Sequence, residues 1–347
     1  MMSWQVVRAM ALGATPVFFA AACVSGISPS TLKSTDFDLS RPDIVAFIDE
    51  MVAKDGFSRD QVTAVVTAAR FRPEVTATMD HPAETTLAWW QYRQRFVTAS
   101  RIQEGLIYWH NNSAALDAVA AESGVPPEYV VAILGIETNY GRSTGAYREI
   151  DTLMTFAFDY PARAEFYRGE LRQFLLLARD LGLNPIDIRG SYGGALGAPQ
   201  MMPSNYRHFV KANPEEKAIN LWTDSKAIIT STADFLRDRG WIRDAPVLTD
   251  AQADDGVSIV GSEGLNLNDT VGSLKVKGVR IEAAPPDTTP VVLIQAALEH
   301  SVQYRVGFNN FYVISRYNPR VNYAMAVCDL AQELRHKVVA EPVAPVL

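Results

Sequence analysis

The sequence predicts a mainly α-helical fold (α+β) with one small β insert, and three observations support this. Apolar residues recur at intervals of three and four through most of the chain from Asp43 onward, which is the spacing of a buried helix face. Many of these segments begin at a capping residue or a proline and end at a glycine. Between Val247 and Val292 the pattern changes to β-branched residues, short alternations and repeated Gly or Asn-Asp turns.

The first residues have the pattern of an export signal. Arg8 precedes an apolar stretch from Ala9 to Ala22, whose fourteen residues are too few for a membrane span. We therefore expect a signal peptide over residues 1–22 and a linker over residues 23–40. A buried N-terminal helix is the weaker alternative, because the following "SGISPSTLKST" is polar.

The two cysteines predict no disulfide framework. The expected cut falls before Cys23, with Ala20 and Ala22 at its −3 and −1 positions. Such a cut also fits lipid modification of Cys23, although that signal usually has Leu where this chain has Ala20. Cys328 lies in an apolar helical pattern and is expected to be an inert core thiol, so packing must stabilise the fold.

The expected helices follow in order along the chain. "DIVAFIDEMVAKDGF" has one apolar face and should stop at Gly56, and Ser58 is a suitable N-cap for the next helix. The segment from Thr86 to Trp109 is rich in aromatic side chains. Later helices are expected at "NSAALDAVAAESG", at "YVVAILGIET" after a Pro-Pro start, and at "RAEFYRGELRQFLLLARDLG", "SKAIITSTADFLRDRGW" and "NYAMAVCDLAQELRHKV".

Near the C-terminus the pattern is less decisive. "LIQAALEHSV" is ambiguous, and "NNFYVISRYN" is expected to be a strand or a short apolar element. The chain is thus divided into a signal peptide (1–22), a linker (23–40), an N-terminal helical part (41–108) and a helical core (109–245). A small β insert (246–295), a C-terminal part of the core (296–340) and a loose tail (341–347) follow.

Composition excludes several classes of function. A hydrophobic fraction of 48% with 20% charged residues is typical of a soluble globular protein. The formal net charge of −7 and the absence of a dense basic run argue against a nucleic-acid partner. The five histidines show no ligand spacing and there is no G-x-S-x-G sequence, so neither a metal site nor a serine nucleophile is expected.

Glu137 is the first candidate for catalysis. In "YVVAILGIETNYGR" it follows an almost wholly apolar run, and the helix face it shares carries Val130, Ile133 and Leu134. Apolar surroundings disfavour a carboxylate, so the pKa of Glu137 should rise, as a general acid requires. The alternative is an ordinary, half-exposed Glu without a role, at a helix end stopped by Gly141. The residues alone favour the catalytic and the ordinary interpretation equally.

Two further features suggest a binding groove. "RGSYGGALGAPQMMPSNY" holds four glycines and two alanines between Gly190 and Ala198, which lets a backbone approach a ligand or a neighbouring element closely. It lacks the Lys-Ser/Thr ending of a phosphate loop. Tyrosines could stack on sugar rings, although most aromatic residues belong to the core; the candidates are Tyr92, Tyr140, Tyr192, Tyr317 and Tyr323.

These residues resemble one known family, the lytic murein transglycosylases of the B type (glycoside hydrolase family 103). "GVPPEYVVAILGIETNYGR" resembles the family's catalytic-helix signature, and "GSYGGALGAPQMMPSNY" its glycine-rich block. "TFAFDYPARAEFYRGELRQFLLLARD", "INLW" and "RYNPRVNYAMAV" resemble further blocks, in the same order. The resemblance runs from about Trp89 to Val327.

The resemblance implies a lysozyme-like α-helical core with an added N-terminal helical part. It also implies a periplasmic enzyme, anchored to the outer membrane if Cys23 is lipidated, that acts on peptidoglycan glycan strands and could associate with cell-wall synthesis or remodelling proteins. The implied reaction cleaves the β-1,4 bond between N-acetylmuramic acid and N-acetylglucosamine without water and leaves a 1,6-anhydromuramyl end. Position by position, the acid/base falls on Glu137, and the substrate-binding residues on Tyr92, Arg163, Ser191, Gln200, Tyr317 and Tyr323; we add Tyr140 from the aromatic pattern.

One departure concerns calcium. Some members of the family bind calcium in an acidic loop, where this chain has "KANPEEKAINLW". Glu215 and Glu216 remain, but Lys211 and Lys217 flank them, and Lys226 stands where a ligating carboxylate is expected. Calcium needs several hard oxygen ligands, so we expect neither a tight calcium site nor any other cofactor.

Two other functions stay open from the sequence. A lysozyme-type hydrolase would need a second acid to hold water, for which Asp151 is a candidate. A non-catalytic peptidoglycan-binding or scaffold protein could retain the groove without the chemistry.

Overall fold

The computed structural model describes residues 35–80, 87–212, 219–254, 257, 265–282 and 285–340. The expected signal peptide, Cys23 and the C-terminal tail lie outside these ranges, as do residues 213–218 of the calcium-type loop. The fold is mainly α-helical with a small sheet, as the sequence predicted. No single helix in the described ranges is long and apolar enough to cross a membrane; α6 and α7 reach that length only together, across a bend of 115°.

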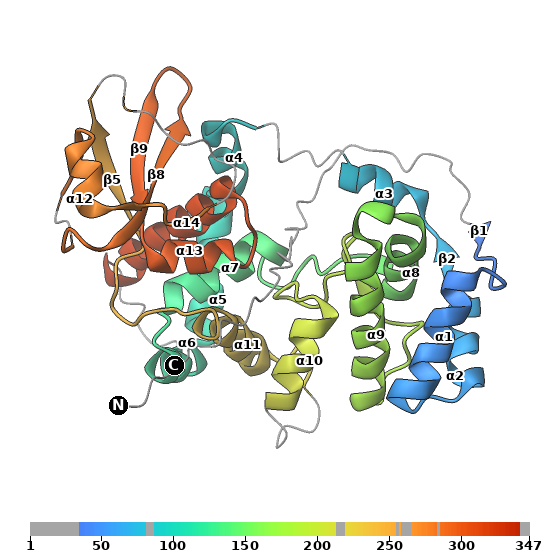
Figure 1. The fold of residues 1–347 in the computed structure, drawn as a ribbon. Coiled ribbons are helices and arrows are strands. Elements are labelled where there is room, and N and C mark those ends of the chain that lie inside the picture. The colour runs from blue at the N-terminus through green and yellow to red at the C-terminus, as the bar shows by residue number, and fades with distance from the viewer. Residues whose placement is uncertain are drawn as a thin grey trace, which may run out of the picture.

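One lobe, on the right of Figure 1, is built from the N-terminal helices and two later ones. We call it the N-terminal lobe; it contains β1 (Thr35–Asp36), α1 (Pro42–Asp55), α2 (Arg59–Ala68), β2 (Arg70–Phe71), α3 (Pro73–Asp80), α8 (Glu149–Asp159) and α9 (Ala164–Asp180). Two expected helix signals are confirmed here. Gly56 ends α1 in a left-handed conformation, and Ser58 caps α2 in a capping box with Gln61.

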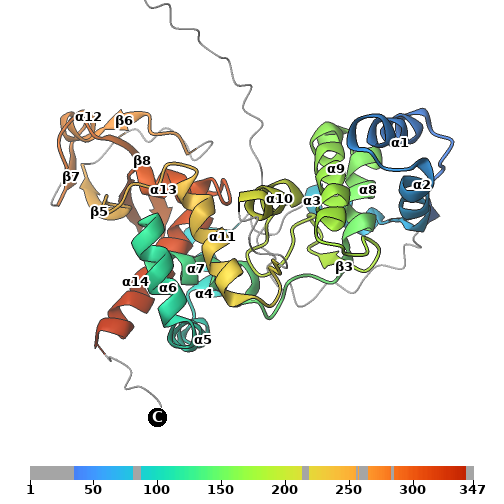
Figure 2. The same cartoon turned by 90° about the horizontal axis from the view of Figure 1, so that it is seen from below.

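The other lobe surrounds α7. We call it the C-terminal lobe; its helices are α4 (Trp89–Phe96), α5 (Ala99–Asn111), α6 (Ser113–Ser123), α7 (Pro127–Thr138), α11 (Ser225–Arg237), α13 (Asn309–Ser315) and α14 (Val321–Ala340). α7 packs on α14, α5, α6 and α11, so it is enclosed on several sides. Figures 1 and 2 both show α10 (Pro203–Ala212) between the two lobes.

The lobes do not follow the boundaries expected from the sequence. α4 falls within residues 41–108 but packs on α14, because Trp89, Tyr92 and Phe96 form its buried face. α8 and α9 fall within residues 109–245 but pack on the N-terminal helices. The chain therefore passes between the lobes more than once, and one crossing follows α7 directly, through residues 139–146 to β3 (Tyr147–Arg148).

The β insert is an antiparallel sheet in the order β6-β8-β9-β5-β7. Its elements are β5 (Leu248–Ala253), β6 (Asp269–Thr270), the short helix α12 (Val271–Val276), β7 (Val279–Ile281), β8 (Pro290–Ala297) and β9 (Val302–Gly307). β8 and β9 pair from Val292↔Gly307 to Ala297↔Val302, so the sheet continues past the expected boundary at residue 295.

The segment "NNFYVISRYN" was expected to be a strand or a short apolar element, and the second alternative is confirmed. Its residues 309–315 form the short helix α13, in which Phe311, Val313 and Ile314 are buried, on a face too broad for strand alternation. The predicted last helix is confirmed as α14, and Cys328 is a buried free thiol on it, as expected. Burial raises the pKa of the Cys328 thiol, which keeps it protonated.

Candidate active site

Glu137 lies inside the protein, one residue before the end of α7. Its side chain is 1% exposed, and every residue from 130 to 138 is buried. The helix stops because Asn139 (φ 50°) and Tyr140 (φ 63°) adopt left-handed backbone angles, followed by Gly141. Two consecutive non-glycine residues in this region are strained, and such strain is concentrated at functional sites.

A tyrosine from the last helix binds the Glu137 carboxyl group. Oη of Tyr323 on α14 donates to Oε1 of Glu137 at 2.6 Å, and both side chains are buried. Burial raises the pKa of Tyr323 well above its ordinary value, and the nearby Glu137 carboxylate adds to the rise. The phenol therefore retains its proton and acts as the donor.

Two more of the expected tyrosines surround this pair. Burial, followed by the charge of Glu137, raises the pKa of Tyr317, and the Tyr317 hydroxyl donates to the carbonyl of Pro199 in the glycine-rich block. Tyr92 is fully buried and lies close enough to Tyr323 to contribute to the rise in its pKa. The structure thus gathers tyrosines from α4, the turn after α13 and α14 around one carboxyl group.

Ser191 organises the glycine-rich loop that follows β4 (Arg189–Gly190). Its Oγ accepts the backbone N–H groups of Ala195 at 3.0 Å and Gly193 at 3.3 Å, and its own N–H bonds the Ala195 carbonyl at 2.9 Å. The side chain is 2% exposed. A hydroxyl that accepts twice keeps one hydrogen to donate.

Gln200 ties the same block to the chain after α7. Its Nε2 donates to the carbonyls of Gly197 at 2.9 Å and Thr144 at 3.2 Å, and its backbone φ is 51°. Its buried Oε1 has no hydrogen-bond partner among the described residues. Gln200 thus combines a strained backbone with a fixed amide group whose oxygen can still accept a hydrogen bond.

Thr138 is a site residue that sequence reasoning missed. Its Oγ1 donates to the carbonyl of Ala198 at 2.7 Å and accepts the N–H of Gly141 at 2.9 Å. Thr138 therefore fastens the end of the helix that carries Glu137 to the glycine-rich block. Its position directly after Glu137 was the one available signal, and the partner, sixty residues later, could not be read from the sequence.

Arg163 ends the short 3-10 helix η1 (Pro161–Arg163) and caps α9. Its guanidinium lies over the ring of Phe166, 4.6 Å from the centroid, and 5.3 Å from that of Tyr167. It is linked to the glycine-rich loop through Tyr167, whose hydroxyl donates to the Gly193 carbonyl. These contacts of Arg163 are with aromatic rings of α9 and not with Glu137, so any role of Arg163 in the site depends on the glycine-rich loop.

Tyr140 has a structural contact where a sugar contact was expected. Its hydroxyl donates to the carbonyl of Arg101 at 2.8 Å, and its ring stacks on Tyr108 at 5.7 Å between centroids. A Cβ at Gly135 would lie 2.6 Å from that hydroxyl, so the ring is pressed against α7. The polar end of Tyr140 is thus used inside the protein.

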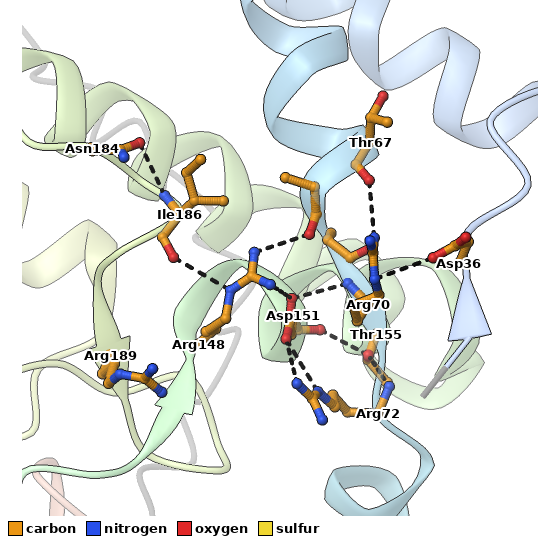
Figure 3. A network of polar contacts seen from close by, with 12 residues as sticks. Asp36, Thr67, Arg70, Arg72, Arg148, Asp151, Thr155, Asn184, Ile186 and Arg189 are labelled. Atoms are coloured by element: carbon orange, nitrogen blue, oxygen red, sulfur yellow. Dashed lines mark hydrogen bonds and ion pairs between the residues drawn. The ribbon is translucent and has the colours of Figure 1, made fainter. Parts of the chain in front are cut away.

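Asp151 belongs to a network of hydrogen bonds and ion pairs that joins α8 to β2 and the residue after it, shown in Figure 3. Its Oδ1 accepts the Arg70 N–H at 2.9 Å, and its Oδ2 accepts Nη2 and Nε of Arg72 at 3.0 and 3.1 Å. Arg148 approaches to 3.7 Å, and Asp151 is 0% exposed. Its carboxylate is committed to holding the N-terminal lobe together, which disfavours it as a water-holding acid.

The family comparison matches residues 40–332 to the Transglycosylase SLT domain. Over 302 residues the chain is 35% identical to the membrane-bound lytic murein transglycosylase B of Escherichia coli (strain K12), which covers 84% of this chain and 82% of that protein.

Solved structures share the fold. The lytic transglycosylase SltB1 of Pseudomonas aeruginosa superposes with a TM-score of 0.81 at 36% identity, covering 86% of this chain and 98% of the other. The Escherichia coli lytic transglycosylase Slt35, solved in complex with bulgecin A, gives a TM-score of 0.80 at 33% identity, covering 90% of this chain and all (100%) of the other.

Proposed function

The chain belongs to the Transglycosylase SLT domain family and is a lytic murein transglycosylase, a lyase that cleaves peptidoglycan, and we propose that Glu137 alone supplies both its acid and its base. The observation that carries the proposal is the buried Glu137 carboxyl group with the Tyr323 hydroxyl at 2.6 Å, next to the glycine-rich block.

In the proposed reaction Glu137 first donates its proton to the oxygen that leaves C1 of N-acetylmuramic acid, and the C1–O4 bond breaks. The N-acetyl group of the same sugar stabilises the electron-poor C1. Glu137, now a carboxylate, then takes the proton from the sugar's 6-hydroxyl as O6 bonds to C1, which closes the 1,6-anhydro ring. The acid is regenerated and no water is consumed.

The Tyr323 hydroxyl is placed to stabilise the Glu137 carboxylate that exists between the two steps. A neutral phenol can donate to the Glu137 carboxylate formed in the first step, and burial keeps the phenol protonated. Because this donor is fixed before reaction, it stabilises the developing charge without reorganising.

The hydrolytic alternative has less support. Ordinary glycosidases flank the scissile bond with two carboxylates. The candidate second acid, Asp151, lies on α8 in the N-terminal lobe, where it accepts hydrogen bonds from Arg70 and Arg72. Glu137 instead lies near the end of α7 in the C-terminal lobe.

The deciding experiment is mass spectrometry of muropeptides released from purified sacculi by the wild type and by Glu137→Gln. We expect anhydromuramyl ends from the wild type and no release by the variant, with its melting temperature unchanged. Reducing muramic ends would indicate a hydrolase, and undiminished release by Glu137→Gln would contradict the assignment of the acid. Glu128→Gln is the matched control: Glu128 is also a buried Glu of α7, but at its other end, where it pairs with Arg335.

The other site residues are proposed to bind the glycan strand. Tyr92 and Tyr317 would line the groove beside Glu137, and Ser191 and Gln200 would present a hydroxyl and an amide to sugar substituents. Arg163 would reach a substituent of the strand from the edge of the loop. Substitution of these groups should raise KM or lower kcat without changing the anhydro product.

We propose that catalysis needs no calcium or other cofactor. Residues 213–218 of the expected loop, which include its two glutamates, lie outside the described ranges, so the support is composition: lysines flank the glutamates. Activity in EDTA should equal activity with added calcium. A fall in activity or melting temperature in EDTA, restored by calcium, would contradict this.

We propose a periplasmic location, with an anchor in the outer membrane through a lipidated Cys23. The support is the signal-like N-terminus and the family's action on murein. Labelled palmitate should enter the wild type but not Cys23→Ser, and the variant should move from the membrane to the soluble periplasmic fraction. Cell-wall synthesis or remodelling proteins are the partners we would seek by cross-linking in intact cells.

A further inference from the structure

A second buried carboxyl group lies on the far side of the glycine-rich loop. Glu149 is the first residue of α8 and is 0% exposed. Neither of its carboxyl oxygens has a hydrogen-bond partner within the part of the chain that the structure describes. Burying such a group is costly, and the proposed reaction does not use it, so its presence needs another explanation.

The loop rests directly on this carboxyl group. A Cβ at Gly190 would lie 2.2 Å from Oε2 of Glu149, and a Cβ at Gly194 would lie 3.3 Å from Oε1. Only residues without a side chain leave room for the carboxyl group at the first of these positions. The backbone of Glu149 is held as well, because its N–H bonds the carbonyl of Ile188 at 2.9 Å.

Between these two glycines stands Ser191. Its hydroxyl accepts the Gly193 and Ala195 N–H groups, and the N–H of Gly194 bonds its carbonyl at 3.2 Å. A displacement of the backbone at Gly190 or Gly194 therefore moves Ser191 with it.

The charged and titratable groups around Glu149 offer it little compensation. Burial raises the pKa of Glu149 well above its ordinary value, and Glu170 on α9 raises it further. Tyr167, also on α9, is a buried neutral phenol. The positive charge of Arg163 lowers the pKa values of Tyr167 and Glu170, against the larger effect of burial. Arg148, the residue before Glu149, donates to the carbonyls of Ala68 and Ile186.

We propose that Glu149 is a positioning residue, whose carboxyl group supports the Gly190–Gly194 backbone from beneath and so sets the position of Ser191 in the active site. The inference rests on the proposed substrate-binding role of that loop. Glu149 does not touch the substrate; it acts through the loop.

The support depends on the carboxyl group being uncharged. Because the folded-state pKa of Glu149 is raised, its contribution to stability is fully present below the ordinary pKa of Glu and is lost as pH rises through the folded-state value. Above that value a charge lies against the loop backbone with Glu170 nearby, and the loop should shift.

The test compares wild type with Glu149→Gln, an uncharged side chain of the same shape, across pH on purified sacculi. The ratio of the variant's kcat/KM to that of the wild type cancels the titration of Glu137, which both share. We expect a ratio near unity in acid that rises, by up to about tenfold per pH unit, above the pKa of Glu149. The melting temperature of the variant should exceed that of the wild type by a margin that grows over the same pH range.

Glu170→Gln is the matched control and should act in the opposite direction. It removes the neighbouring carboxylate, which lowers the pKa of Glu149, so the loss of activity should begin at lower pH than in the wild type. A flat activity ratio for Glu149→Gln, even with a changed melting temperature, would reduce Glu149 to a purely structural residue and overturn the proposal. That result would leave the anhydro product and the role of Glu137 untouched, since both are decided by the muropeptide experiment.

Discussion

The hydroxyl of Tyr323 donates to the carboxyl group of Glu137 across 186 residues of sequence. The contact joins α14 to the end of α7, two helices that pack along one another in the C-terminal lobe. Packing of the helices thus fixes the donor and the acid relative to each other before any substrate arrives, which is the preorganisation that electrostatic catalysis requires.

Tyr323→Phe removes this donor while keeping the ring. A hydrogen bond to a charged group contributes about 1.5–3 kcal/mol, so kcat should fall by roughly 10- to 100-fold, with anhydro ends still the product. Turnover of purified sacculi measures the loss. Tyr206→Phe is the control, because Tyr206 is also a fully buried tyrosine, but its hydroxyl donates to the Ile219 carbonyl at 2.9 Å. Equal losses in kcat from both variants would refute a specific role for the Tyr323 hydroxyl.

Tyr140→Phe separates the structural contact from the sugar contact that the sequence suggested. The Tyr140 hydroxyl donates to the Arg101 carbonyl, so the variant should lose about 1 kcal/mol of unfolding free energy and keep its KM. Urea unfolding and kinetics on isolated glycan strands provide the two readouts. A raised KM with unchanged stability would restore Tyr140 to the substrate groove.

Asp151→Asn should damage the fold and spare the chemistry. The buried carboxylate pairs with Arg72 and accepts the Arg70 N–H, and breaking a buried ion pair costs about 3 kcal/mol. We expect a lower melting temperature and unchanged anhydro products at a temperature where the variant is folded. Abolished turnover in a folded variant would instead favour the hydrolase with a second acid.

Local signals were sufficient to predict the helices α1, α2, α6, α7, α9, α11 and α14 and the change to β structure after Val247. Gly56 ends a helix because it can adopt a positive φ, and Ser58 caps the next one because its hydroxyl reaches an orphan N–H. The same reasoning located Glu137 on a buried helix face before a sharp stop. In "NNFYVISRYN", by contrast, apolar residues are too few and too close together to distinguish strand from helix, and the helix follows from packing.

Contacts between residues far apart in the chain could not be predicted from the sequence. The aromatic supply predicted tyrosines near Glu137, but not that Tyr323 would contact the acid while Tyr140 turned its hydroxyl inward. Asp151 could not be separated from a catalytic acid until Arg70 and Arg72 were found around it. Each of these assignments depends on which helices pack together, and no residue pattern states that.

Thr138→Val tests whether the end of α7 and the glycine-rich block must be joined for catalysis. The substitution keeps the shape of the side chain and removes its hydroxyl, which leaves the Ala198 carbonyl and the Gly141 N–H without this partner. A buried polar group left unpaired costs about 2 kcal/mol, so the melting temperature should fall by several degrees. Because the lost bond spans the two parts of the site, kcat should fall further than the fraction of unfolded protein explains. Thr67→Val is the control, since the Thr67 hydroxyl makes only an exposed bond within α2. A Thr138→Val enzyme with reduced stability and full kcat would show that Glu137 and the glycine-rich block act independently.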